Sequence, residues 1–197
     1  MYSKLLLQWP WIVSIGWDNG THWNSYCTGS IISRFAILTA GHCFFTRKIK
    51  LPEDFERRDI TKVRLGDQTL NDDTNELNMA KTYEINTVIG HPKYRNSGVK
   101  YDIAVIITKE PIQFNARTKP VCLPNEAYNS TDKYANQTAK FAGFGYFDGT
   151  NTASDELRGA NFKILSEVDC VSQNLYRPRR GAQKHFFCAG NLVSQLA

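Results

Sequence analysis

The most chemically distinctive stretch of this sequence is LTAGHC, at residues 38–43. His42 follows an apolar segment, residues 36–39, that is typical of a buried strand, and the small residues Ala40 and Gly41 come between them. Small residues allow the backbone to turn tightly, so the imidazole can be presented at the end of a strand instead of being buried. An imidazole held in this way could serve as a general base.

A second candidate lies 60 residues after His42, where Asp102 opens the apolar segment Ile103-Ala104-Val105. A carboxylate beside a buried strand is costly unless it is hydrogen-bonded or paired with a charge. Asp102 could therefore cap a turn, or it could face another polar group that the fold brings to it.

The cysteines near His42 raise the alternative of a zinc site. Cys27, His42, Cys43 and Cys188 do not form the two close ligand pairs that are typical of structural zinc. We therefore expect no metal and no cofactor. Two other histidines, His22 and His91, are expected to be structural or exposed to solvent, and His185, beside an apolar segment, has no expected role.

The pattern of the whole chain predicts short β-strands. Segments rich in Val, Ile and Tyr are separated by turn residues, which is typical of a sandwich or a barrel. The predicted strands are residues 11–17, 26–32, 36–39, 62–65, 83–89 and 103–107, then 138–147, 157–165 and 185–189. Residues 167–175 are the best candidate for a short helix.

In their order along the chain, these motifs resemble those of the trypsin-like serine proteases. LTAGHC is similar to the LTAAHC motif of that family, with Gly41 in place of the second alanine, and residues 102–105 resemble its DIAL motif. Further stretches that resemble the family in the same order are WPWIV (9–13), CTGSII (27–32), VRLG (63–66), HPKY (91–94), PVCLP (120–124), GFG (143–145) and FCAG (187–190).

The resemblance implies an all-β fold with two antiparallel six-stranded barrels, the second of them incomplete in this chain. It implies a single peptidase domain over residues 1–197. The N-terminal barrel would occupy residues 8–112, a connector residues 113–124, and a partial C-terminal barrel residues 125–197.

The same resemblance implies that His42 is the general base and that Asp102 orients it. In the family, FCAG is followed by a GDSGGP stretch with the nucleophilic serine and the oxyanion-hole amides, whereas NLVSQLA follows Gly190 here. Ser194 has no flanking glycines and is not expected to be a nucleophile. We expect a trypsin-like serine endopeptidase, which hydrolyses peptide bonds by acyl transfer, present as a partial and inactive chain. The alternative is a catalytically inactive homologue that acts as a binding or regulatory protein.

Five cysteines leave one without a partner inside the chain. The resemblance pairs Cys27 with Cys43 and Cys170 with Cys188. In many family members the cysteine equivalent to Cys122 bonds to a propeptide or a light chain, so we expect such a partner here. The other expected partners are protein substrates or protease inhibitors.

The sequence also favours an extracellular location. Asn-x-Ser/Thr triplets at Asn19, Asn129 and Asn136 are potential glycosylation sites, and disulfides persist outside the cell. Residues 1–7 are too short for a signal-peptide core, which suggests an incomplete N-terminus. No apolar run approaches the ~18 residues of a membrane span.

The net charge of +5 is modest. Two basic runs, at residues 47–50 and 177–180, are expected to be solvated loops. We therefore expect neither nucleic acid nor a membrane as a partner.

Overall fold

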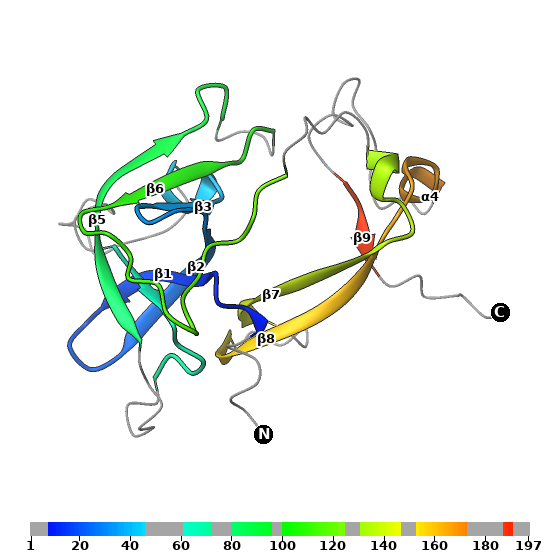
Figure 1. Cartoon of the computed structure of the whole chain (residues 1–197). Helices are drawn as coiled ribbons and strands as arrows, with labels where there is room; N and C mark the ends of the chain where they lie inside the picture. Colours follow the sequence, from blue (N-terminus) through cyan, green and yellow to red (C-terminus); the bar gives the residue numbers. More distant parts are fainter. Residues whose placement is uncertain are drawn as a thin grey trace. The chain divides into compact units, whose positions relative to one another are not determined.

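The chain divides into two compact units in the computed structural model (Figure 1). Unit 1 comprises Met1–Leu123 and Ala142–Arg158, and unit 2 comprises Pro124–Phe141 and Gly159–Ala197. The residues that the structure describes are 8–45, 61–71, 80–95, 100–124, 131–146, 153–172 and 187–190. Across these ranges, no helix combines the length and the apolar character that a membrane crossing requires.

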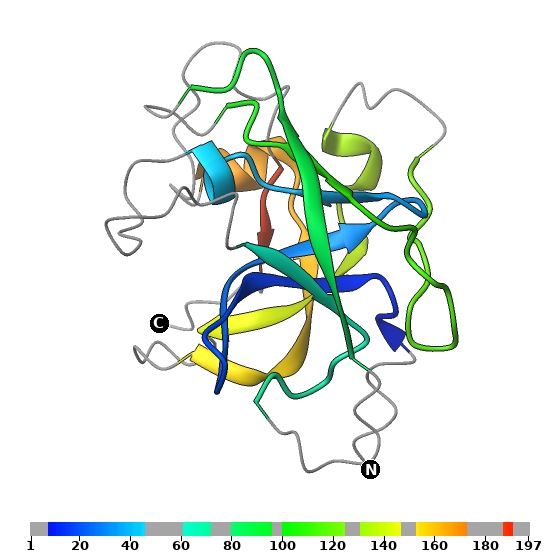
Figure 2. The ribbon, with the colours of Figure 1, turned by 90° about the vertical axis from the view of Figure 1, so that its left-hand side faces the viewer.

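Six antiparallel strands close a barrel in unit 1, in the order β1-β2-β3-β6-β5-β4 (Figures 1 and 2). These strands are β1 (Ile12–Asp18), β2 (Trp23–Ile31), β3 (Ala36–Thr39), β4 (Lys62–Leu65), β5 (Lys81–Gly90) and β6 (Ala104–Thr108). Each strand has a neighbour on both sides, so the barrel has no free edge. The predicted all-β class is therefore confirmed.

Alternate side chains of each strand fill the barrel, because successive residues of a strand point to opposite faces. In β6, Ala104, Ile106 and Thr108 are buried, whereas Val105 and Ile107 between them are half-buried. The fully or nearly buried members of the core are Val13, Ile15, Ile31, Ile37, Val63, Leu65, Tyr83, Ile106 and Ile112. Removing this apolar surface from water is the main stabilising contribution to the barrel.

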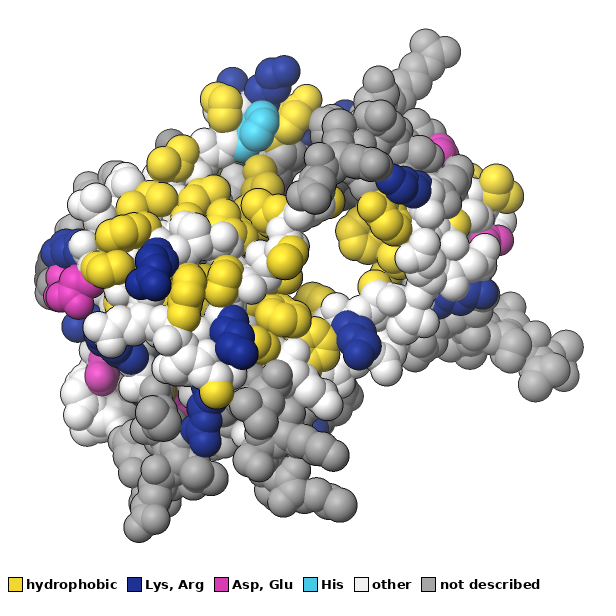
Figure 3. All heavy atoms as spheres, in the orientation of Figure 1, with side chains coloured by type: hydrophobic (Ala, Val, Ile, Leu, Met, Phe, Trp, Pro, Cys, Tyr) yellow, Lys and Arg dark blue, Asp and Glu magenta, His cyan; other side chains and the backbone are white. Residues whose placement is uncertain are grey.

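The outer face of the barrel is also apolar where β3, β6 and β5 lie side by side. Val105 pairs with Leu38 on one side and with Ile89 on the other, and the Ile89 side chain is exposed. Figure 3 shows hydrophobic side chains gathered on this side of unit 1.

The register of β3 and β6 brings two distant parts of the sequence to one end of the barrel. Their paired residues run from Ala36 with Ile107 to Thr39 with Ala104. The residues that follow β3 and the residues that precede β6 therefore meet at this end.

The remaining strands form a three-stranded sheet in the order β7-β8-β9. They are β7 (Thr138–Tyr146), β8 (Ala153–Ile164) and β9 (Ala189–Gly190), and β8 and β9 are antiparallel. β7 and β8 each contain residues of both units. Within unit 1, Ala142 and Leu157 from these strands pack with Trp9.

Unit 2 also contains η1 (Thr131–Tyr134) and α4 (Glu167–Ser172). Ser166 caps α4, because its Oγ accepts the backbone N–H of Asp169 at 3.1 Å. The helix predicted at residues 167–175 is thus present as far as Ser172, and residues 173–175 lie outside the described ranges. The strand predicted at 185–189 is described only from residue 187, and β9 begins at Ala189.

Candidate active site

His42 is the first residue of α2 (His42–Phe45), a single helical turn that follows β3. The carbonyl of Gly41 accepts the backbone N–H of Phe44 at 3.1 Å and of Phe45 at 2.9 Å, which fixes the turn. A Cβ on Gly41 would lie 3.3 Å from Asp102 Oδ1 and 3.4 Å from the Tyr94 ring. A small residue at position 41 therefore lets the carboxylate approach the start of α2.

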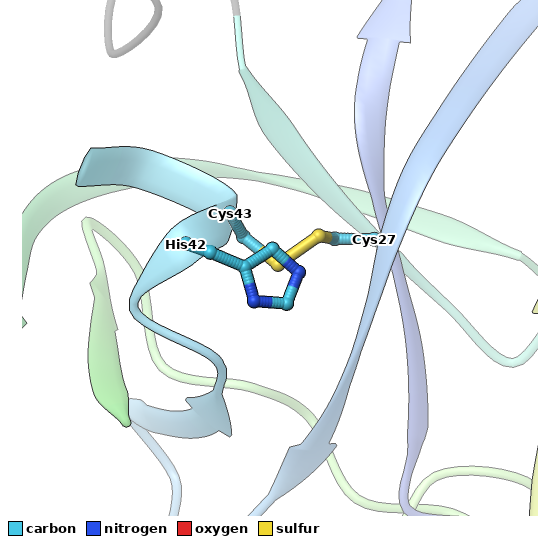
Figure 4. Close-up of side chains that lie close together, drawn as sticks. All are labelled: Cys27, His42 and Cys43. Atoms are coloured by element: carbon cyan, nitrogen blue, oxygen red, sulfur yellow. A yellow bond between two sulfur atoms is a disulfide. The ribbon is translucent and has the colours of Figure 1, made fainter. Parts of the chain in front are cut away.

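A disulfide joins α2 to the wall of the barrel. Cys43 is buried and is bonded to Cys27 of β2, with 6.2 Å between their Cα atoms. Figure 4 shows the imidazole of His42 beside this disulfide. Ligand atoms of the three residues lie within 4.8 Å of one another, but both sulfurs are engaged in the disulfide and offer no thiolate to a metal.

Asp102 contacts His42 at two points. Its Oδ1 accepts the backbone N–H of His42 at 2.7 Å, and its Oδ2 lies 2.7 Å from Nδ1 of the imidazole. An ionised carboxylate can only accept hydrogen bonds, so Nδ1 is the donor and carries the proton of the neutral ring. Nε2 is then left as an acceptor, which is the state that a general base requires.

The imidazole is open to solvent, whereas the carboxylate is more enclosed. The side chains of His42 and Asp102 are 55% and 23% exposed, respectively. Among the residues that the structure describes, none forms a hydrogen bond with Nε2 of His42. A reacting group could therefore approach this nitrogen.

Tyr94 closes one side of the site. Its ring lies against Gly41, and its backbone N–H donates to the carbonyl of His91 at 2.9 Å. Burial, and then the negative charge of Asp102, raise the pKa of the Tyr94 phenol above its ordinary value. The phenol therefore stays neutral beside the carboxylate.

The backbone before Asp102 has an unusual conformation. Tyr101 has φ +59°, in the left-handed region, which costs a residue with a side chain about 1–2 kcal/mol. The Tyr101 ring is stacked on that of His91, with 4.7 Å between centroids and 11° between planes. His91 was expected to be structural or exposed to solvent, whereas Tyr101 could not be singled out, because no glycine or asparagine marks a left-handed turn at this position.

The other predicted site residues lie away from His42 in the sequence. Cys170 and Cys188 form a disulfide in unit 2, with Cα atoms 5.9 Å apart, and Cys122 is a free, exposed cysteine. Asn19 is exposed, and its Oδ1 accepts a hydrogen bond from Oγ1 of Thr21 at 3.0 Å. Asn136 is also exposed. Asn129 and Ser194 lie outside the described ranges.

The closed barrel and the sequence motifs together define a trypsin-like protease domain. Residues 4–196 match the family model described as Trypsin, and the chain belongs to this family of serine proteases.

Among known proteins the chain is similar to several proteases. It is 30% identical over 182 residues to transmembrane protease serine 11A of Homo sapiens, covering 92% of this chain and 38% of that protein. It is 26% identical over 189 residues to the clotting factor G beta subunit of Tachypleus tridentatus, covering 92% and 56%. It is 29% identical over 190 residues to venom serine protease Bi-VSP of Bombus ignitus, covering 92% and 48%. The chain thus spans about half the length of these relatives.

Proposed function

We propose that this chain supplies the general base and the orienting carboxylate of a trypsin-like serine endopeptidase. The observation that carries the proposal is the two-point contact between Asp102 and His42. One hydrogen bond fixes the backbone of His42 and the other fixes its tautomer, so Nε2 can accept a proton. Membership of the trypsin family supports this assignment.

The chemistry would follow the acyl-transfer scheme of serine proteases. As the oxygen of a serine nucleophile bonds to the scissile carbonyl carbon, Nε2 of His42 accepts the hydroxyl proton. Asp102 stabilises the resulting imidazolium, which then gives its proton to the leaving amine. Water attacks the acyl-enzyme in the second half of the reaction, and His42 again transfers the proton. We assign the nucleophile to no residue of the printed sequence.

Hydrolysis of peptide anilides by recombinant protein expressed from the complete natural reading frame, here called the full-length protein, tests this function. His42→Ala should lower kcat by on the order of 10⁶-fold, as loss of the equivalent base does in another serine protease. Unchanged turnover in this variant would contradict the proposal. A folded full-length protein without turnover would instead favour a regulatory homologue that binds substrates or inhibitors.

Labelling of the 197-residue chain by itself gives a second test. We expect no covalent adduct with a fluorophosphonate, because such reagents need an activated serine. A clear adduct would show that the chain contains its own nucleophile.

We also propose an extracellular location and a covalent partner. Two disulfides and the exposed acceptor Asn19 support the location, and the exposed thiol of Cys122 supports a bond to a pro-region or light chain. In secreted full-length protein, glycosidase treatment should change the mobility of the wild type more than that of Asn19→Gln. Electrophoresis without reductant should show a disulfide-linked adduct of higher mass in the wild type, and this band should be missing in Cys122→Ala. Equal mobility of wild type and variant in each comparison would contradict these assignments.

A further inference from the structure

We propose that His91 and Tyr101 are positioning residues that hold Asp102 in its two-point contact with His42. This inference rests on the proposed function of the His42–Asp102 pair. Neither positioning residue is assigned a contact with the reacting atoms, so both would act through the direction of the carboxylate.

The first argument comes from the backbone around Asp102. Tyr101 immediately precedes it and has φ +59°, a conformation that bulky residues rarely adopt. Such a residue keeps this conformation only where its surroundings impose it. Relaxation of Tyr101 to an ordinary α or β conformation would rotate φ by roughly 120° or more and would redirect the Asp102 side chain.

The second argument is that His91 contacts the residues on both sides of Asp102. Its ring is stacked on Tyr101 at 4.7 Å, and its backbone N–H donates to the carbonyl of Ile103 at 3.1 Å. The backbone N–H of Ile103 in turn donates to the carbonyl of Tyr101 at 2.8 Å. His91, the residue immediately after β5, therefore contacts both ends of the turn that carries the carboxylate.

The His91 ring is itself held in place. Its Nδ1 accepts the backbone N–H of Lys93 at 3.1 Å, which makes the neutral ring an Nε2–H tautomer. The ammonium group of Lys93 lies 5.8 Å from the centroid of the Tyr101 ring and adds a cation–π contact. Lys93 thus contacts both rings of the stack, through its backbone N–H at His91 and through its ammonium group at Tyr101.

The chemical consequence concerns the tautomer of His42. Both carboxylate oxygens lie 2.7 Å from their His42 donors, so a change in the direction of Asp102 lengthens at least one of these hydrogen bonds. Without the acceptor at Nδ1, the neutral imidazole can place its proton on Nε2. In that form it cannot accept a proton from a nucleophile at Nε2.

Nitrogen-15 NMR of the 197-residue chain, labelled at histidine, measures this tautomer directly. We expect the Nδ1–H form of His42 in the wild type, its loss in Asp102→Asn, and a mixture of tautomers in Tyr101→Ala. Tyr101→Phe keeps the aromatic ring, so this variant should show the same Nδ1–H signal of His42 as the wild type. Trp17→Ala is a matched control, because it removes one ring of the Trp17–Tyr26 pair in the same unit and should leave the tautomer unchanged.

A second variant covers the case in which Tyr101→Ala does not fold. Glycine adopts the left-handed conformation without penalty, so Tyr101→Gly can form the turn but has no ring to hold it. We expect a mixture of His42 tautomers in this variant as well. In the full-length protein, kcat should fall by up to about 100-fold with little change in KM, because a small displacement of a catalytic group has an effect of this size.

The outcomes separate this inference from the function on which it rests. If Tyr101→Gly, or a folded Tyr101→Ala, keeps the full Nδ1–H signal, the stack is only structural and the inference is overturned. If the wild type shows the Nε2–H form, or Asp102→Asn keeps the Nδ1–H form, the proposed function of the pair fails instead.

Discussion

Replacing Cys27 and Cys43 together by alanine should destabilise unit 1 and loosen the candidate site. The disulfide closes a loop with a sequence separation of 16. The chain-entropy account of disulfides assigns about 3 kcal/mol of stabilisation to a loop of this size. The bond is also the covalent link between β2 and α2, so its loss should let His42 move relative to Asp102.

The second disulfide offers a matched control for this experiment. Cys170 and Cys188 have a sequence separation of 18, so the same account predicts a loss within about 0.1 kcal/mol of the first. This bond lies in unit 2, and its removal should leave the His42 tautomer unchanged. The two double variants should therefore lose similar stability but differ in their effect on the site.

Amide hydrogen exchange can assign each loss to its unit. The exchange rates of the β6 amides measure the free energy of opening of unit 1. The amides of Ile164 and Leu165, which donate to the carbonyls of Gln137 and Cys188, report on unit 2. A loss in unit 1 below about 1 kcal/mol would refute the entropic estimate. Equal changes of the His42 tautomer in both double variants would refute the link between the disulfide and the site.

Three further predictions follow from other contacts. Asp102→Asn should lower kcat/KM of the full-length protein by on the order of 10⁴-fold in a peptide hydrolysis assay, because an amide nitrogen facing Nδ1 favours the wrong tautomer; a loss below about tenfold would contradict this. Gly90→Ala should lower the free energy of unfolding by about 1 kcal/mol in thermal denaturation, because its methyl group would lie within 3.0 Å of three Phe45 ring carbons and would displace this partly exposed ring; Phe45→Leu should reduce this cost. The hydrogen bond from Lys109, and then the charge of Lys109, lower the pKa of Glu84 in the folded protein. The ionised carboxylate therefore stabilises the fold at pH values above its unfolded pKa near 4.5, and this stabilisation is lost as the pH falls through the lower folded pKa. Lys109→Met should therefore flatten the dependence of stability on pH in the acid range, as measured by urea unfolding, and an unchanged slope would contradict this.

Most strands of the barrel could be predicted from the sequence, because they are rich in residues with a high strand propensity. Ala36–Thr39 and Lys62–Leu65 have the predicted bounds. The first is an apolar segment, and the second alternates basic residues with buried Val63 and Leu65. The first residues of β8 were not predicted. Ser154, Asp155 and Glu156 have low strand propensity, and pairing with a distant segment fixes them instead.

That pairing is visible in backbone hydrogen bonds within unit 1. The N–H of Leu70 donates to the carbonyl of Asp155 at 2.9 Å, and the N–H of Leu157 donates to that of Gln68 at 2.8 Å. The local pattern of residues 154–156 carries no signal of a partner more than 80 residues away, so this part of β8 was not predictable.

The two central residues of the candidate site were identified from the sequence, but their support was not. His42 and Asp102 stand in short motifs beside apolar strands, and such motifs can be recognised locally. The stack of His91 on Tyr101 depends on the relative position of the β5 end and the turn before β6. A left-handed tyrosine carries no local signal, because its conformation is imposed by these tertiary contacts.

The pairing of β3 with β6 has a consequence for how the chain folds. Thr39 and Ala104 are far apart in the sequence, so this ladder must overcome a larger loop-closure entropy than the β1–β2 hairpin. Local hairpins are favoured early in folding, and long-range ladders form more slowly. The two halves of the proposed proton-transfer pair would then meet only late in folding, and partly folded chains would lack this arrangement.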